Sequence, residues 1–102
     1  MANSNPPAKN QAFTFSIALQ DYASPGNFKA NPTIASGDFK IKIDDAAVAN
    51  LTNLPTVTPA GGIWVKIVLT AAEMNGDNIG IQGIDQTGTK EWADYALTIL
   101  TT

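Results

Sequence analysis

The amino-acid sequence predicts an all-β protein, an antiparallel β-sandwich of seven to eight strands with one short helical turn. Apolar and polar residues alternate over several short segments, which is the pattern of strands that bury one face. Turn residues separate these segments at intervals of about 8–12 residues, a spacing typical of sandwiches. The chain has 102 residues, so it can form one domain with a modest core.

Residues 1–11 come first and are polar, contain two prolines and show no periodicity. We expect them to form an extended N-terminal arm in front of a sandwich domain over residues 12–102. Ordering an arm costs about 1–2 kcal/mol of backbone entropy per residue, so we expect it to be fixed only where a partner holds it. The candidate partner-binding residues of the arm are Asn3, Pro6, Pro7 and Lys9.

Five segments show the clearest strand pattern, with an apolar residue at every second position. They cover residues 13–19, 39–43, 63–69, 79–81 and 95–99. Their inward side chains should form the core between the two sheets. We expect this core to contain Phe13, Phe15, Ile17, Phe39, Ile41, Ile43, Val65, Ile67, Leu69, Ile79, Ile81, Tyr95 and Leu97.

The alternation is weaker between residues 48 and 57. This part of the chain predicts one or two short strands between loops. Pro55 and Pro59 favour a position at a sheet edge, because proline cannot donate to a ladder.

The helical turn is expected at residues 70–75, between two strand patterns. Thr70 and Glu73 have the spacing of a capping box, in which each side chain accepts a hydrogen bond from the other residue's backbone N–H. Two alanines between them favour helix, and Asn75-Gly76 ends the turn. A single capped turn suits a chain that crosses from one sheet to the other.

The composition argues against most chemistry. The chain has no Cys and no His, so it lacks a general base near pH 7, a thiol nucleophile and the usual zinc ligands. All six basic residues are lysines and the net charge is −3, and this composition argues against binding to nucleic acid. No run approaches the about 18 apolar residues of a membrane helix. We therefore expect that the protein is not an enzyme, binds no cofactor and does not insert into a membrane. Carboxylate chemistry at Glu73 and Glu91 is a distant alternative.

Two acidic pairs, Asp44-Asp45 and Asp77-Asn78, could hold calcium. Neither has the alternating spacing of a calcium-binding loop, and such pairs are common in turns. We interpret them as turn residues and expect no metal. The same interpretation applies to Asp38 and Asp85.

The two tryptophans are predicted on the faces opposite the core stripe. Trp64 and Trp92 share these faces with Val68, Ala96 and Leu100, which are apolar where a solvated strand carries charge. Exposed aromatic patches mark protein contacts, so both tryptophans are candidate partner-binding residues. Two alternatives remain open: a strand twist or bulge turns one tryptophan back under a loop, or the rings form a platform for sugars.

Three stretches carry a resemblance: "FKANPTIASGDFKIKIDDAAVANL", "LPTVTPAGGIWVKIVLTAAEMNGDNI" and "GIDQTGTKEWADYALTI". Together they resemble a small immunoglobulin-like domain found in virion proteins of tailed bacteriophages, from about Ala12 to Thr101. The hydrophobic strand that runs into Leu-Thr-Ala-Ala-Glu-Met-Asn is the most specific part. Asp45-Ala46-Ala47 stands where the family has Asp-Gly-Gly.

The resemblance implies an immunoglobulin-like sandwich and a structural accessory protein on the virion surface, assembled in the host cytoplasm. The expected task is capsid decoration through contacts with other virion proteins. The alternative is a tail-associated adhesion or carbohydrate-binding module that contacts a host surface glycan. Association with further copies of the same chain is also compatible with either role.

Overall fold

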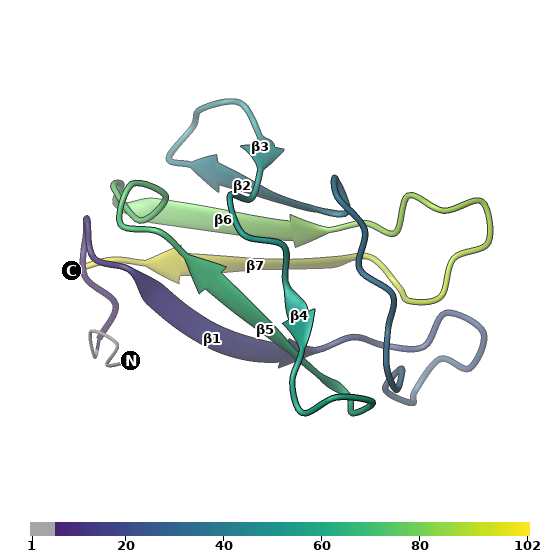
Figure 1. The fold of residues 1–102 in the computed structure, drawn as a ribbon. Helices are drawn as coiled ribbons and strands as arrows, with labels where there is room; N and C mark the ends of the chain where they lie inside the picture. The colour runs from purple at the N-terminus through teal and green to yellow at the C-terminus, as the bar shows by residue number, and fades with distance from the viewer. Residues whose placement is uncertain (1–5) are drawn as a thin grey trace.

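Seven strands in two antiparallel sheets form the protein in a computed structural model, which describes residues 6–102 (Figure 1). The strands of the first sheet are β1 (Phe13–Ala18), β5 (Trp64–Leu69) and β4 (Thr56–Val57), in that order. The strands of the second sheet are β3 (Ala49–Asn50), β2 (Phe39–Ile43), β6 (Asn78–Gly83) and β7 (Tyr95–Leu100), in that order. The predicted all-β sandwich is confirmed.

The strand order is that of an immunoglobulin-like sandwich. If β1 is named strand B of that fold, the first sheet has the order B-E-D and the second has C′-C-F-G. The long connections 19–38 and 84–94 both lie at the end of the sandwich where β1 and β6 finish (Figure 1). We call this the loop end. The connection 70–77 and the C-terminus lie at the opposite end.

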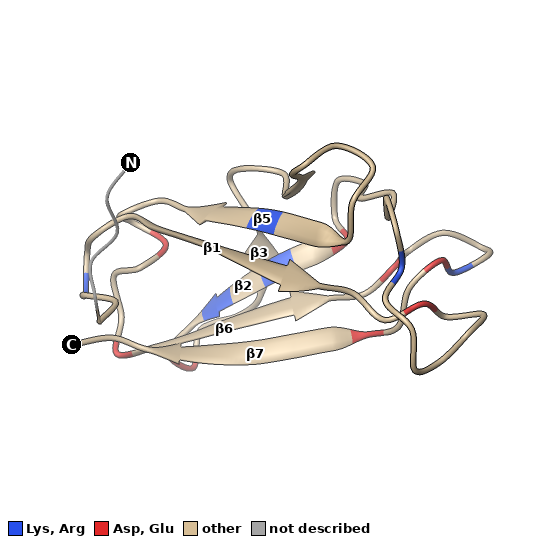
Figure 2. Ribbon diagram, turned by 90° about the horizontal axis from the view of Figure 1, so that it is seen from below, with Lys and Arg blue, Asp and Glu red and all other residues tan. Residues whose placement is uncertain are grey.

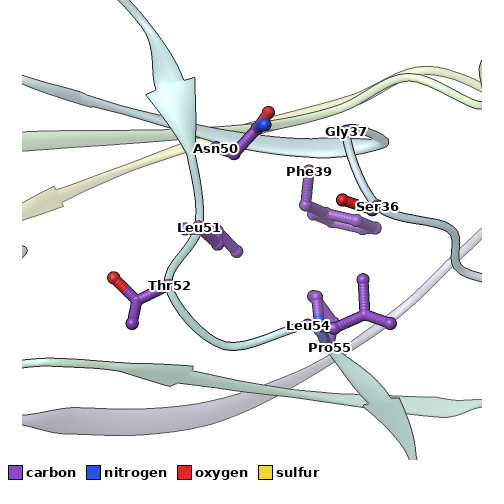
Figure 3. A pocket seen from close by; sticks show the side chains of 8 residues that line it. All are labelled: Ser36, Gly37, Phe39, Asn50, Leu51, Thr52, Leu54 and Pro55. Carbon is purple, nitrogen blue, oxygen red and sulfur yellow. The ribbon is translucent and has the colours of Figure 1, made fainter.

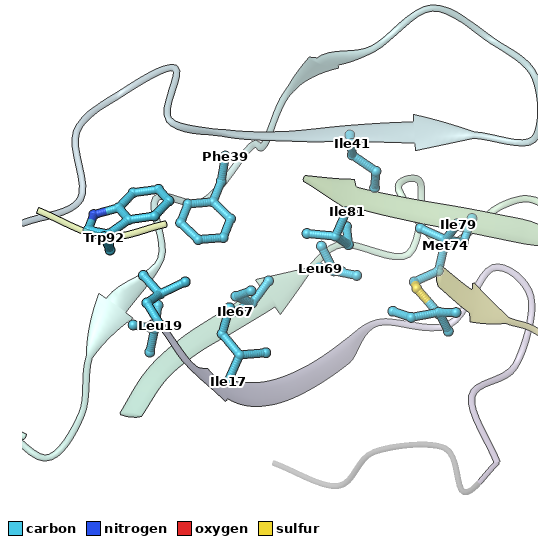
Figure 4. Packing of buried hydrophobic residues seen from close by; sticks show 12 residues of the cluster. Ile17, Leu19, Phe39, Ile41, Ile67, Leu69, Met74, Ile79, Ile81 and Trp92 are labelled. Carbon is cyan, nitrogen blue, oxygen red and sulfur yellow. The ribbon is translucent and has the colours of Figure 1, made fainter. Parts of the chain in front are cut away.

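The core lies between the two sheets (Figure 4). Eight of the thirteen expected core residues are buried, and Phe13, Phe15, Ile43, Tyr95 and Leu97 are half-buried against them. Leu19 and Ile99 extend the same inward stripes of β1 and β7. Met74 and Trp92 join the core from connections, which strand periodicity does not predict.

The prediction of a helical turn at residues 70–75 is wrong, although the predicted capping box is present. The Glu73 N–H donates to the Thr70 hydroxyl at 3.1 Å, and the Thr70 N–H donates to the Glu73 carboxylate at 2.8 Å. Residues 71–74 are hydrogen-bonded turns, and no helix occurs among the described residues. Helix nucleation is costly, and Gly76 follows too soon for a second turn to stabilise the first.

The part of the arm that the structure describes docks on its own domain. The Thr102 N–H donates to the Pro7 carbonyl at 2.9 Å, and the Lys9 N–H donates to the Thr102 carbonyl at 3.1 Å. The Asn10 N–H donates to the Met74 carbonyl at 3.0 Å, and the Lys9 ammonium lies 2.5 Å from the Asp77 carboxylate. The expectation that only a partner fixes the arm is therefore wrong for residues 7–10.

The other candidate residues of the arm differ in position. Pro6 and Lys9 are exposed, and Pro7 is half-buried. Asn3 lies outside the described residues.

Candidate interaction surface

Three exposed aromatic residues lie at the loop end, one in β5 of the first sheet and two in the connection that follows β1. Trp64 is 49% exposed, Tyr22 is 55% exposed and Phe28 is 60% exposed. Trp64 pairs with Ala18 across the β1–β5 ladder, and Phe28 pairs with Gln20 just beyond the end of β1. We call Tyr22, Phe28 and Trp64 the aromatic face.

Strand alternation explains why these three rings share one side. Leu19 points into the core and is 1% exposed, so its neighbours Ala18 and Gln20 point outward. Trp64 and Phe28 lie opposite these two residues and therefore point outward as well. Tyr22 has the spacing of the same series, two residues after Gln20, and the Lys90 ammonium lies 6.0 Å from the centre of its exposed ring.

A buried aspartate joins the two long connections at the loop end. Asp38 is 1% exposed, and its carboxylate accepts hydrogen bonds from the Ala35 N–H at 2.9 Å and the Gln86 N–H at 3.1 Å. These bonds link the end of the 19–38 connection to the start of the 84–94 connection. Asp38 is a turn residue, as expected, through its bond from Ala35. Its second bond, from Gln86, joins parts of the chain that are far apart in the sequence.

A second buried aspartate organises the 84–94 connection. The Asp85 carboxylate accepts from the Thr87 N–H at 3.0 Å, the Thr87 hydroxyl at 2.8 Å and the Glu91 N–H at 2.8 Å. Burial raises the pKa of Asp85, but the bonds from Glu91 and Thr87, together with the Lys90 charge, outweigh it and hold the pKa below its usual value. The carboxylate therefore stays ionised and fixes the loop.

Trp92 is a core residue, which corrects its expected place on a contact surface. It is fully buried, its ring stacks on Phe39 with centroids 5.4 Å apart, and its indole N–H donates to the Thr33 carbonyl at 3.2 Å. Trp92 precedes β7 and pairs with Asp21, so the β7 alternation does not apply to it. The alternative that a loop covers one tryptophan is the one observed.

Trp64 is exposed, as expected, but the aromatic face contains two residues that the sequence analysis missed. Tyr22 and Phe28 lie in a loop rich in Gly, Pro and Asn, which has no strand periodicity. The available signal was the presence of two large aromatic residues where no apolar stripe could bury them. An aromatic ring without a core-facing position is a candidate surface contact.

A pocket of about 120 Å³ lies between β2 and the crossover from β3 to β4 (Figure 3). Phe39, Leu51, Leu54 and Pro55 supply its apolar lining, and none of its lining residues carries a charge. The pocket therefore has no group for acid–base chemistry, and its volume suits only a very small ligand.

The carboxylates considered for catalysis do not converge. Glu73 lies in the 70–77 connection and Glu91 in the 84–94 connection, at opposite ends of the sandwich (Figure 1). The Glu73 carboxylate accepts from Thr70 and Thr52 N–H groups, and the Glu91 carboxylate accepts from the Thr33 N–H. Both side chains hold backbone segments in place.

The residues considered for calcium also serve as turn residues. One Asp44 carboxylate oxygen accepts from the Asp77 N–H at 3.0 Å and the Asn78 N–H at 3.1 Å. Asp44 itself has a φ of 51°, which an aspartate tolerates in a tight turn. Within residues 6–102, no three acidic side chains form a group that could hold a metal ion.

Lysine and acidic residues are scattered along the ribbon of residues 6–102, and the lysines do not gather in one stripe (Figure 2). In the described part of the chain, no helix is long and apolar enough to cross a membrane.

Comparisons with protein-family models, with curated proteins and with solved structures found no match to this chain. The resemblance to phage immunoglobulin-like domains therefore stays a prediction from the sequence.

Proposed function

We propose that this chain is a non-enzymatic structural accessory protein of a bacteriophage virion, which decorates the capsid surface through protein–protein contacts. The aromatic face is the observation that carries the binding role. Tyr22, Phe28 and Trp64 expose about half or more of their surface each, on a domain that otherwise buries its large aromatic side chains at least in part. Aromatic residues of this kind are enriched at the centres of protein interfaces.

The construction of the loop end supports the same role. Hydrogen bonds from the Gln86 N–H to Asp38 and from the Trp92 indole to Thr33 join the two long loops at the loop end. Asp85 holds the 84–94 loop in shape through its own bonds to Thr87 and Glu91. A surface held in this way loses little conformational entropy when it binds. Many copies on one lattice would also gain avidity from individually weak contacts.

A tail-associated adhesion or carbohydrate-binding module is the second candidate. One observation favours it: the exposed Gln20 lies opposite Phe28, so an amide flanks aromatic rings on a free surface. Sugars bind aromatic faces with amide groups at their edges. Binding of the purified chain to host-cell polysaccharide, lost in the variants Trp64→Ala and Gln20→Ala, would favour this role over capsid decoration.

Particle composition tests the proposal. We expect purified particles of the phage that encodes this chain to contain it in many copies, as measured by quantitative mass spectrometry. Separated heads should retain the chain and separated tails should lack it. Particles without the chain would refute the virion role, and a chain found only in tails would favour the second candidate.

A further inference from the structure

We propose that the free edge of β7 is a homodimer interface, at which two copies of this chain pair their β7 strands antiparallel about a twofold axis at Thr98. The partner is thus a second copy of the same chain. This inference does not depend on the proposed virion role.

The hydrogen bonds at the end of β7 define which backbone groups face outward. The Thr101 N–H donates to the Asp77 carbonyl on the β6 side, whereas the Thr102 N–H and carbonyl bond to the arm on the other side. Along an antiparallel strand these directions alternate. The N–H and C=O groups of Ala96, Thr98 and Leu100 therefore face the outer edge, where no bond from the described residues reaches them.

Pro7 interrupts the ladder that the described part of the arm forms at the end of β7. The arm pairs with Thr102 in a parallel manner, through the Pro7 carbonyl and the Lys9 N–H. The next donor of such a ladder would be the N–H of residue 7, directed at the Leu100 carbonyl. Proline has no N–H, so residue 7 cannot donate to the Leu100 carbonyl, and the bonds that the described part of the arm makes to this edge are confined to Thr102.

Several features that protect edge strands from pairing are missing from β7. Its sequence, YALTIL, has no charge, no proline and no glycine, and the nearest charge is Asp94, directly before the strand (Figure 2). Natural proteins commonly place lysine, proline or a bulge on such an edge. An unprotected edge of six residues can bind another β-strand through its backbone.

The side chains of β7 are complementary to those of a second β7. With the axis at Thr98, Ala96 of each copy lies opposite Leu100 of the other, on the same outward face. Leu100 is 69% exposed, and Ala96 is small. Ala96, Thr98 and Gly80 also line a hollow of about 240 Å³ on this face, which can receive the neighbouring leucine.

The strand β1 is the competing edge, since it borders the other sheet and is also uncharged. Its edge is flanked by residues 91–93, which bond to Gln20 and Tyr22 just beyond its end. Its outward side chains Thr14, Ser16 and Ala18 offer no large apolar group that matches Leu100. The observations therefore favour β7.

Sedimentation of the purified chain tests this interface. An edge-to-edge contact is small, so we expect a weak dimer whose population rises between about 10 µM and about 1 mM. The mean mass should rise from 10.7 kDa toward twice that value. Thr98→Lys should remain monomeric, because two lysines would meet at the axis. Ser16→Lys places the same charge on β1 and should dimerise like the original chain.

Three results would overturn the proposal. They are a monomer at all concentrations, a dimer that Thr98→Lys does not weaken, and a dimer that Ser16→Lys abolishes. Circular dichroism establishes that both variants are folded.

Cysteine cross-linking gives a second test that does not depend on the lysine variants. The chain has no cysteine, so one introduced thiol can link only to its copy. Paired Cα atoms at the axis lie about 5.5 Å apart, within disulfide reach. Thr98→Cys should form a covalent dimer on mild oxidation, while Ala96→Cys and Ser16→Cys should not. A dimer from either control in place of Thr98→Cys would refute the proposed axis.

Discussion

Three buried carboxylates hold the connections of this fold, and none of them is free for chemistry. Asp38, Glu73 and Asp85 each accept hydrogen bonds from at least two groups of the chain. Among the described residues, no buried side-chain nitrogen or oxygen lacks a partner. Charged groups in hydrogen bonds of this kind are costly to remove, because the N–H groups they leave behind stay buried.

For these carboxylates, the sequence predicts the hydrogen bonds between residues that are close together in the chain, and it does not predict the long-range ones. Thr70 and Glu73 form the expected capping box, because the spacing of their side chains alone determines it. The bond from the Thr52 N–H to the other Glu73 oxygen, at 2.9 Å, depends on how the chain folds back and is invisible in a local pattern. The same holds for the bond from the Gln86 N–H to Asp38.

Removing the Glu73 carboxylate should therefore cost more than removing the cap. We expect Glu73→Ala to lower the free energy of unfolding by about 2–3 kcal/mol, because two N–H groups lose a charged acceptor. Thr70→Ala should cost about 1 kcal/mol. Urea denaturation measures both, and Asn75→Ala, an exposed position in the same connection, is the control. Equal stability of Glu73→Ala and the original chain would contradict this assignment.

Asp85 should make stability depend on pH. Its pKa is lower in the folded chain than in an unfolded one, so its contribution is present above the unfolded value and is lost as pH falls toward the folded value. Asp85→Asn should therefore destabilise most near neutral pH, with a difference that shrinks as pH falls below about 4. Urea denaturation across this range measures it, with Asp45→Asn as the exposed control. A constant difference at all pH values would argue against an ionised Asp85.

At the scale of elements, the strands follow their apolar alternation and the connections do not. The N-terminal arm has no periodicity, yet Pro7, Lys9 and Asn10 bond to Thr102 and Met74. These hydrogen bonds join backbone groups. Every residue has a backbone C=O and every residue except proline has a backbone N–H, so the composition of the arm does not reveal them. Trp92 is a similar case, since its ring packs against Phe39 and bonds to Thr33, which are both far from it in the sequence.

The arm should contribute to stability as well as to any contact with a partner. A chain that begins at Ala12 loses the three backbone bonds from residues 7–10 and the Lys9–Asp77 ion pair. We expect it to fold with a free energy of unfolding lower by about 1–3 kcal/mol. Thermal and urea denaturation measure this, and a chain that begins at Pro6 is the control. If both truncated chains were equally stable, the docked arm would contribute nothing.

At the scale of the whole molecule, the sandwich was predictable because its sheets are amphipathic. Alternation at β1, β2, β5, β6 and β7 identifies the strands that form the core. The aromatic face was only partly predictable. Trp64 follows from the β5 alternation, whereas Phe28 reaches the same end of β1 through its pairing with Gln20, and Tyr22 lies in the connection that follows β1. A surface assembled from loops has no periodic signal in the sequence.

The central claim, that this domain binds a virion through its aromatic face, is tested most directly by adding the chain back to particles from which its gene has been deleted. We expect the original chain to bind in saturable, many-copy stoichiometry, measured by co-sedimentation with particles. Trp64→Ala should reduce binding at least tenfold, as for an interface centre. Leu54→Ala, which removes an equally exposed apolar group elsewhere, should bind normally. No binding of the original chain, or full binding of Trp64→Ala, would contradict the claim.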